Sequence, residues 1–375
     1  MSKRNESWIF VIVFCWLAAL QGSFGCSSAE DGGGGDDDMD AGADGDTDSD
    51  SDGDADTDAD TDSDTDADAG DAGADAIEMD CSSCPSQGGT LENMTCAFDL
   101  CDETVVVESD YYSKTGISTT CTLEDTYQAV AHFGATTNGL APKLNDSYAL
   151  MASGPAEGTS HSMSCDDYSI VVEDPWSDEG YDIHDVMEWR LILQAPQAAE
   201  AFRFKYVFFS EEYDEFISTV YNDKFYVVLE AGSTNGGNPT VINFTDCRDP
   251  DDYWDFVCEA DDESCEPGQK YCYIAINSAF SDCCWYEDCP DGYSYDVGTD
   301  IGGTGFECAA SQTEDSSSSG SSTGWLQTSW PIDGGETFAV TFHIHDTSDG
   351  VYDSEVILDA FEFLKDPDQG TVVVE

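Results

Sequence analysis

Cysteines are the feature that most limits how this chain can fold. Fourteen of its 16 cysteines lie between Cys81 and Cys308, while Cys15 and Cys26 stand in or directly after an apolar N-terminal segment. An even number at this density is typical of proteins that mature in an oxidising compartment, where paired sulfurs persist. We therefore expect up to seven disulfides, drawn from Cys81, Cys84, Cys96, Cys101, Cys121, Cys165, Cys247, Cys258, Cys265, Cys272, Cys283, Cys284, Cys289 and Cys308.

Zinc is the alternative use of these thiols. Cys81 and Cys84 have the CxxC spacing of a zinc ligand pair, but the other cysteines do not repeat it with partner pairs. None of the five histidines completes a zinc-finger pattern. Disulfides are the favoured interpretation, and their connectivity stays open because spacing alone does not determine it.

The N-terminus has the pattern of an export signal. Lys3 and Arg4 precede an apolar run over residues 8–20, which is too short for a stable membrane span and suits a signal peptide over residues 1–25. The following cysteine, Cys26, stands where a bacterial lipobox places the lipidated residue.

Lipidation of Cys26 predicts how the chain is placed in the cell. Ser27 and Ser28 follow it, with no Asp that would indicate retention in the inner membrane. We expect an outer-membrane lipoprotein that faces the exterior and contacts the membrane through its N-terminal lipid. The alternative is a cleaved signal peptide and a freely secreted protein.

Residues 26–80 are predicted to be a disordered stalk behind the lipid. Residues 27–80 contain 23 Asp or Glu residues and no Lys or Arg, and Met39 is the one large apolar residue between residues 32 and 75. Such a segment cannot form a core, and its like charges extend it. Residues 48–53 read DSDSDG, the first half of a calcium loop, but Ala59 stands where the closing Glu of an EF-hand would be.

Residues 81–375 predict an all-β domain, a β-sandwich with a jelly roll as one form of it. Runs of β-branched and aromatic residues are separated by Gly, Asn and Asp, and several alternate between apolar and polar positions. A helix is expected only over residues 123–133. Residues 247–308 hold eight cysteines and are interpreted as a disulfide-rich insertion. The expected strands include residues 104–107, 202–209, 224–229, 336–345 and 353–364.

The acidic balance excludes some partners. The formal net charge is −69, which repels nucleic acid and anionic lipid. It favours cations, Ca²⁺ above all, because Ca²⁺ takes carboxylate and carbonyl oxygens. Solubility outside the cell is the alternative explanation of this charge.

Three segments of the strand region form a specific pattern. Residues 206–225 read YVFFSEEYDEFISTVYNDKF: a strand that ends in SEEY, a loop, and a strand that begins with NDKF. Residues 148–154 read YALMASG, and residues 343–356 read HIHDTSDGVYDSEV. In this order, over about residues 125–364, they resemble the choice-of-anchor L domain family of exported bacterial surface modules.

The resemblance implies a surface module but no biochemical activity. The family carries varied C-terminal anchors. This chain stops at Glu375 without one, so the lipid on Cys26 is expected to replace it. Residues 247–308 depart from the family pattern, which supports an insertion there.

Carboxylates of these segments are the candidate site. The strand pattern breaks at Ser210, so Glu211 and Glu212 can leave the strand and meet residues of the later segments. Crowded carboxylates raise each other's pKa, and a cation cancels that cost. We expect Ca²⁺ on a subset of Glu211, Glu212, Asp223, Asp346, Asp349 and Asp353, with the hydrogen bonding of Asp in turns as the alternative.

A catalytic role is the less favoured hypothesis. Glu212 and Asp223 could act as the acid and base of a glycoside hydrolase, but nothing in the sequence sets their separation. His343 and His345 share one strand face and could ligate a transition metal, although such a pair more often serves packing. We expect no enzyme.

The expected function is therefore adhesion or binding outside the cell, through an extracellular glycan, a matrix polymer or another surface protein. A structural coat component without a specific ligand is the alternative. Tryptophans that can stack on sugars are Trp176, Trp254, Trp285, Trp325 and Trp330, most of which we expect in the core.

Overall fold

The structure is a computed structural model, and all its described residues lie in the second of two compact units, residues 1–65 and 66–375. The signal peptide, Cys26 and residues 27–75 of the stalk lie outside the described residues. Among those described, no helix has the length and apolarity needed to cross a bilayer. The structure describes residues 76–86, 91–102, 104–113, 128–134, 141–154, 156, 172–176, 181–212, 216, 219–247, 250–251, 253–260, 262, 264–275, 278, 321–348, 350 and 353–374.

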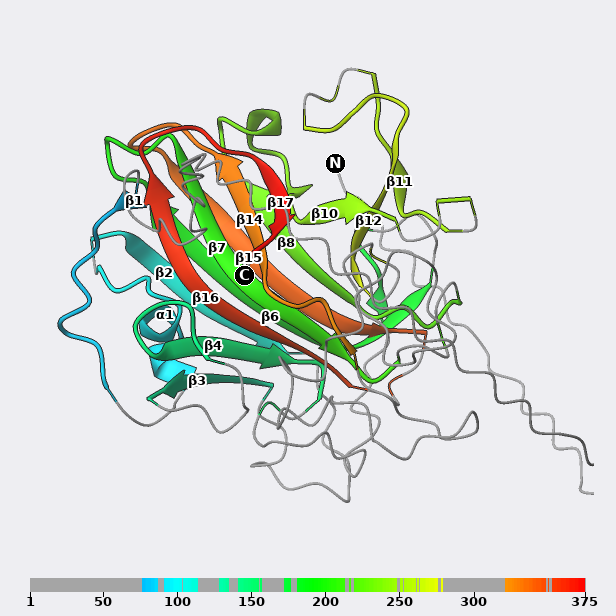
Figure 1. Cartoon of the computed structure of the whole chain (residues 1–375), viewed down its shortest axis with the longest axis horizontal. Coiled ribbons are helices and arrows are strands. Elements are labelled where there is room, and N and C mark those ends of the chain that lie inside the picture. Colours follow the sequence, from blue (N-terminus) through cyan, green and yellow to red (C-terminus); the bar gives the residue numbers. More distant parts are fainter. Residues whose placement is uncertain are drawn as a thin grey trace, which may run out of the picture. The chain divides into compact units, whose positions relative to one another are not determined.

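The described residues form a sandwich of two antiparallel sheets, which confirms the predicted fold class (Figure 1). The first sheet has eight strands and is built around β7 and β16. β1 pairs with β16, and β13 pairs with β7. The path of this sheet runs β17 (Gly370–Val373), β14 (Leu326–Pro331), β7 (Ala201–Ser210), β16 (Ser354–Leu364), β4 (Ser147–Ala152) and β3 (Ala129–Phe133), with β1 (Ala76–Ile77) and β13 (Ser321–Ser322) beside it.

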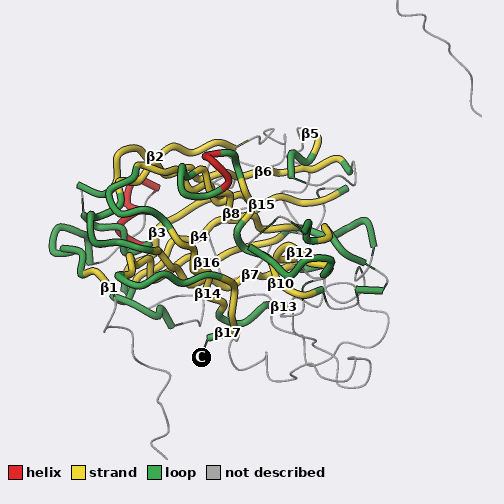
Figure 2. Tube along the Cα trace, turned by 90° about the horizontal axis from the view of Figure 1, so that it is seen from above, coloured by secondary structure: helices red, strands yellow, loops and turns green. Residues whose placement is uncertain are grey.

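The second sheet has nine strands and is built around β15. β15 lies between β6 and β8 and is paired with both over most of its length. Seen from above, β2, β6, β8 and β15 lie in one layer and β7, β14, β16 and β17 in the other (Figure 2). The path runs β10 (Phe244–Asp246), β12 (Lys270–Ala275), β8 (Lys224–Glu230), β15 (Thr337–Thr347), β6 (Asp182–Gln194) and β2 (Val106–Ser113), with β11 (Phe256–Val257), β5 (Val172–Glu173) and β9 (Thr240–Val241) beside it.

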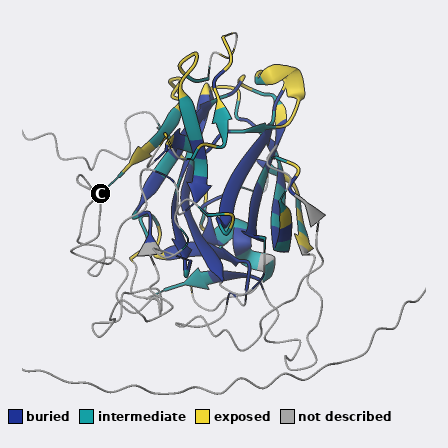
Figure 3. Cartoon of the chain, turned by 90° about the vertical axis from the view of Figure 1, so that its right-hand side faces the viewer, coloured by how far each residue is buried: buried dark blue, intermediate teal, exposed yellow. Residues whose placement is uncertain are grey.

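Alternation along the strands creates the core. In β7, Phe202, Phe204 and Phe208 point between the sheets and are buried. The intervening Arg203 points to the other face, where its Nε donates to Glu362 at 2.9 Å. The buried strands fill the centre of the molecule, as Figure 3 shows in dark blue. Each buried Phe contributes about 1.5–3 kcal/mol of hydrophobic stabilisation.

Phe98 closes the space between the two sheets. It follows the short helix α1 (Met94–Ala97), which is preceded by the 3-10 helix η1 (Leu91–Asn93). Its ring lies 6.0 Å from Phe204 of the first sheet and 5.2 Å from Phe342 of the second, measured between centroids. The disulfides Cys81–Cys101 and Cys84–Cys96 tie this segment together, so the CxxC pair does not bind zinc.

Two of the expectations on secondary structure are wrong. Residues 129–133 form strand β3, because β3 pairs with β4 and tertiary pairing overrides the local helical pattern. Thr104 and Val105 form a turn, so the strand predicted over residues 104–107 begins only at Val106. The other four expected strands are present as β7, β8, β15 and β16.

The cysteine-rich region joins the second sheet. β12 lies inside residues 247–308 and pairs with β8 through Ile274 and Phe225, so part of the predicted insertion extends the sandwich. Disulfides Cys247–Cys272 and Cys258–Cys265 hold this region. A further 3-10 helix, η4, spans Asn235–Gly237. Outside the described residues lie Cys121, Cys165, Cys283, Cys284, Cys289 and Cys308.

Candidate functional site

Ends of six strands meet at one end of the sandwich. β4, β7 and β15 end there, and their antiparallel neighbours β6, β8 and β16 begin there. A hydrogen bond between the sheets locates the junction: Ser354 Oγ, at the start of β16, donates to Asp223 Oδ2, directly before β8, at 2.7 Å. This arrangement gathers side chains from segments that are far apart in the sequence.

Asp223 joins the two sheets. Its Oδ1 accepts the backbone N–H of Thr347 at 3.0 Å, and its Oδ2 accepts the hydroxyl of Ser354. The residue is completely buried. Burial raises the pKa of Asp223 to about 7, although the hydrogen bonds from Ser354 and Thr347 act in the opposite direction. Both oxygens of Asp223 are thus engaged by protein donors.

Glu212 supports Asp223. β7 ends at Ser210, as the sequence predicts, and the Ser210 hydroxyl accepts the backbone N–H of Glu212 at 3.1 Å. Glu212 is buried, and its Oε2 accepts the backbone N–H of Asp223 at 3.1 Å. Glu211 is half-buried, and its backbone N–H donates to the carbonyl of Asp353. Ser210 and Glu212 therefore hold Asp223, the residue directly before β8, in place.

Asp346 is different because its carboxylate has no such support. It is 1% exposed, and neither Oδ1 nor Oδ2 has a hydrogen-bond partner among the described residues. Burial raises the pKa of Asp346 well above its usual range, and the charges of Asp223, Asp185 and Asp353 raise it further, while the Ser153 side chain acts in the opposite direction. Two buried oxygens without donors are costly in a protein interior and call for a cation or a proton.

Asp185 reaches this cluster through a β-bulge, which no local pattern in the sequence indicates. The pairing of β6 with β15 shifts between Ile344 and Asp346, and Asp185 adopts a positive φ of 49°. A bulge redirects a side chain, and Asp185 is buried beside Asp346. Gln128 Nε2 donates to the Asp185 carbonyl at 2.8 Å.

Two glycines leave room for the carboxylates. A Cβ atom on Gly154 would lie 2.2 Å from the Asp353 carboxylate, and one on Gly350 would lie 2.5 Å from Asp185 Oδ2. Side chains at these positions would displace the acids. Because Gly154, the last residue of the YALMASG segment, has no side chain, the Asp353 carboxylate can lie against the end of β4.

The structure thus brings together most of the predicted site residues. Glu212, Asp223, Asp346 and Asp353 converge, Glu211 lies at the edge, and Asp185 is added. Asp349 lies outside the described residues. The carboxylate oxygens of the described residues form no set of three within 4.8 Å of one another; the sets that meet this limit each include two disulfide-bonded cysteines. A cation here would therefore require the carboxylate oxygens to move closer together.

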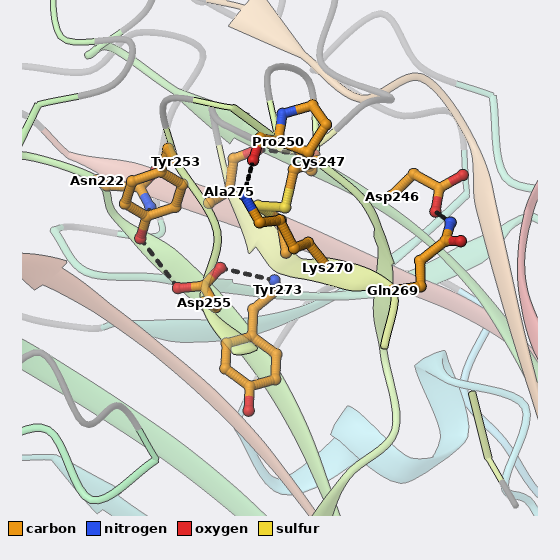
Figure 4. Close-up of a disulfide and its surroundings, with 12 residues drawn as sticks. Asn222, Asp246, Cys247, Pro250, Tyr253, Asp255, Gln269, Lys270, Tyr273 and Ala275 are labelled. Carbon is orange, nitrogen blue, oxygen red and sulfur yellow. Dashed lines mark hydrogen bonds between the residues drawn. A yellow bond between two sulfur atoms is a disulfide. The ribbon is translucent and has the colours of Figure 1, made fainter. Parts of the chain in front are cut away.

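A second polar network adjoins the site through β8. Lys224 Nζ lies 2.7 Å from Asp255 Oδ1, and both side chains are almost completely buried. Figure 4 shows Asp255 between Tyr253, whose hydroxyl donates to it at 2.9 Å, and Tyr273, whose backbone N–H donates at 2.9 Å. Asn222 Nδ2 donates to the Tyr253 hydroxyl at 3.1 Å. This network joins the cysteine-rich region to the site.

Comparisons with known proteins identify the region that contains the site. A family model described as the choice-of-anchor L domain matches residues 193–364, a shorter stretch than the 125–364 of the resemblance. No curated protein and no solved structure matches the chain. The matched stretch contains four of the clustered acids, Glu212, Asp223, Asp346 and Asp353. Other residues of the site, Asp185, Gln128 and Gly154, precede the matched stretch. The strands β4 and β6, which begin before it, nevertheless belong to the same two sheets. The family comprises β-rich modules of bacterial cell-surface proteins. Residues 193–364 therefore match the choice-of-anchor L domain family, which the sequence pattern also resembles.

Proposed function

We propose that this chain is a cell-surface lipoprotein whose extracellular β-sandwich binds Ca²⁺ at the junction of the six strand ends and attaches to a partner outside the cell. The observation that carries the calcium proposal is Asp346: a buried carboxylate without a hydrogen-bond donor among the described residues, surrounded by Asp185, Asp223 and Asp353.

The donor set favours calcium over other cations. Side chains around Asp346 offer oxygen atoms, which Ca²⁺ binds at about 2.3–2.6 Å with a flexible number of ligands. We assign Asp185, Asp346 and Asp353 as direct ligands. Asp223 and Glu212 are positioning residues, because their oxygens accept hydrogen bonds from the protein.

Calorimetry and thermal unfolding test this assignment. Titration of the full, disulfide-bonded chain with CaCl₂ after chelation is expected to release or absorb heat. Saturating calcium at about 100 times its dissociation constant stabilises a fold by about 2.7 kcal/mol. The melting temperature is then expected to rise by about 5–10 °C.

Asp346→Asn is the decisive variant, because it removes the charge at the centre of the cluster and keeps the shape. Asp262→Asn is the matched control, since Asp262 is an exposed carboxylate outside the cluster. Loss of the calcium response in Asp346→Asn alone supports the proposal. No heat and no thermal shift in the wild-type chain would refute it.

Attachment outside the cell is proposed from the family and from the exported, crosslinked character of the chain. Trp325 and Trp330 are buried, whereas Trp254 is 40% exposed, with the ammonium of Lys270 over its ring at 3.6 Å from the centroid. Binding to a glycan array in the presence of calcium, weakened by Trp254→Ala, supports a glycan partner. No binding on the array, together with self-assembly of the chain, would instead support a structural coat.

The membrane anchor has its own test. Cells that express the full chain are labelled with radioactive palmitate, and Cys26→Ala serves as the control. Label in the wild-type chain alone supports lipidation of Cys26. Equal label in both chains, or none, means a secreted protein or another anchor.

A further inference from the structure

A buried row of polar side chains crosses the outer face of the second sheet. His343 and His345 lie on β15, two residues apart, and their neighbours Phe342 and Ile344 point into the core. His343 Nδ1 lies 2.9 Å from Glu188 Oε1 on β6, and His343 Nε2 lies 2.9 Å from His345 Nδ1. The two rings therefore use nitrogens on each other and cannot both bind one ion.

The row determines which atoms of His345 carry hydrogen. The Glu188 carboxylate accepts a hydrogen bond, so His343 Nδ1 carries the hydrogen and, in a neutral ring, His343 Nε2 carries the lone pair. His345 Nδ1–H then donates to His343, which leaves a lone pair on His345 Nε2. Burial, and then the charge of Lys224, lower the pKa of His345 well below its usual range. A neutral ring is consistent with this.

The lone pair of His345 faces another acceptor. His345 Nε2 is buried, has no hydrogen-bond partner among the described residues, and lies 4.0 Å from Asp174 Oδ2. Asp174 Oδ2 accepts the hydroxyl of Tyr226 at 2.7 Å, and its Oδ1 accepts the backbone N–H of Trp176 at 2.9 Å. Two acceptors thus face each other with no donor of the described residues between them.

We propose that His345 Nε2 and Asp174 Oδ2 bind a divalent transition-metal ion of the Zn²⁺ class, next to the Tyr226 hydroxyl. A separation of 4.0 Å is too long for a hydrogen bond. It is close to twice the metal–ligand distance of about 2.0–2.2 Å for imidazole nitrogen and carboxylate oxygen, so an ion near the line between the two atoms can contact both, and a tetrahedral site would draw them closer together.

The surroundings of the two ligands fit this assignment. Metal-binding histidines usually donate their other ring nitrogen to an outer partner, as His345 does to His343. Asp174 is oriented by the backbone of Trp176. Among the described residues of this network, the carboxylates of Asp174, Glu188 and Asp255 are accompanied by one ammonium, that of Lys224, so the network has an excess of negative charge that a dication offsets. Imidazole is a ligand for Zn²⁺ or Co²⁺ rather than Ca²⁺.

Titration with Co²⁺ tests the site, because its visible absorption reports nitrogen and oxygen ligands directly. The full chain, treated with chelator and then saturated with Ca²⁺, is expected to bind one Co²⁺ that Zn²⁺ displaces. His345→Asn and Asp174→Asn are each expected to abolish the absorption band. His343→Gln is expected to weaken Co²⁺ binding by about 10–100-fold, as outer partners of ligands do.

His132→Asn is the matched control. His132 also has a buried ring nitrogen without a described partner, but it lies on β3 in the other sheet. This variant and Asp346→Asn are both expected to keep Co²⁺ binding, so the transition-metal and calcium proposals fail independently. Two results would overturn the transition-metal site: no Co²⁺ band in the wild-type chain, as a bridging water between the acceptors predicts, or a band unchanged in both ligand variants.

Discussion

The effect of Asp346 on the stability of the fold is expected to change sign when Ca²⁺ binds. Its oxygens lack donors among the described residues, and three other carboxylates surround it. Without a cation the residue is held protonated or repelled by its neighbours. With Ca²⁺ the same charge becomes a ligand. Whether Asp346 stabilises or destabilises the fold therefore depends on whether Ca²⁺ is present.

Asp346→Asn is predicted to have opposite effects in the two conditions. In chelator, the variant should be more stable than the wild-type chain by about 1–2 kcal/mol, because the Asn side chain neither takes up a proton nor buries a charge on folding. In saturating Ca²⁺ it should be the less stable of the two. Urea unfolding in both buffers measures the difference, and the same sign in both would contradict the calcium assignment.

Gly154→Ala is predicted to damage the site through sterics. Its Cβ would overlap the Asp353 carboxylate at 2.2 Å, so the side chain or β4 must shift, at a cost of about 1–3 kcal/mol. Calcium binding should weaken as well. Gly232→Ala is the control, because its Cβ would make an ordinary contact of 3.6 Å with Glu336. Urea unfolding and calorimetry check both variants, and equal losses would exclude the steric explanation.

At the scale of elements, a bulge in β6 and a short strand in the cysteine-rich region shape the site. The bulge at Asp185 redirects its side chain to Asp346. β12 continues the second sheet beyond β8 and carries Tyr273, whose backbone donates to Asp255. Asp255 in turn pairs with Lys224, the first residue of β8. The region is therefore a structural support for β8.

Lys224→Met is predicted to destabilise the chain by about 3–5 kcal/mol, because it leaves the buried carboxylate of Asp255 without its cation. Arg190→Met is the control. Arg190 pairs with Glu230 at 3.3 Å, but both side chains are about 40% exposed, so its loss should cost about 0–1 kcal/mol. Chemical denaturation measures both, and an equally small effect for Lys224→Met would contradict the role of this buried ion pair.

At the scale of the whole molecule, buried acids link stability to pH. Burial raises the pKa of Asp223 to about 7, of Asp99 to about 8 and of Asp359 to about 6. Asp99 accepts Asn145 Nδ2 at 2.9 Å and the backbone N–H of Ala360 at 3.1 Å. A raised pKa in the folded state means that the folded chain holds the proton more tightly than the unfolded chain.

In chelator, stability is therefore predicted to fall as pH rises from about 5 to about 8.5. The contribution of these acids is complete below the unfolded pKa of about 4 and is lost as pH passes through their folded values. Asp99→Asn should make this decline shallower, and Ca²⁺ should restore more stability at pH 8 than at pH 5. Melting temperatures across this range test it; a melting temperature that rises with pH would contradict the assignment.

The sequence by itself determined the β-sandwich class, the disulfide chemistry and four of the acidic residues that converge, Glu212, Asp223, Asp346 and Asp353. Alternation in residues 202–209 and 336–345 is a local property, and it indicated β7 and β15 directly. The segments around Glu212, Asp223 and Asp346 resemble a family, so their convergence was expected before any geometry.

Features that depend on pairing between distant segments of the chain were decided only by the tertiary structure. The helix expected over residues 123–133 is a strand over Ala129–Phe133, because β4 offers it a partner. Asp185 enters the site because β6 gains one residue relative to β15, which no local pattern shows. His343 and His345 look alike in sequence, but the neighbours Glu188 and Asp174 give them different roles. Register and burial are properties of the whole chain, and they set which polar atoms are left to bind a ligand.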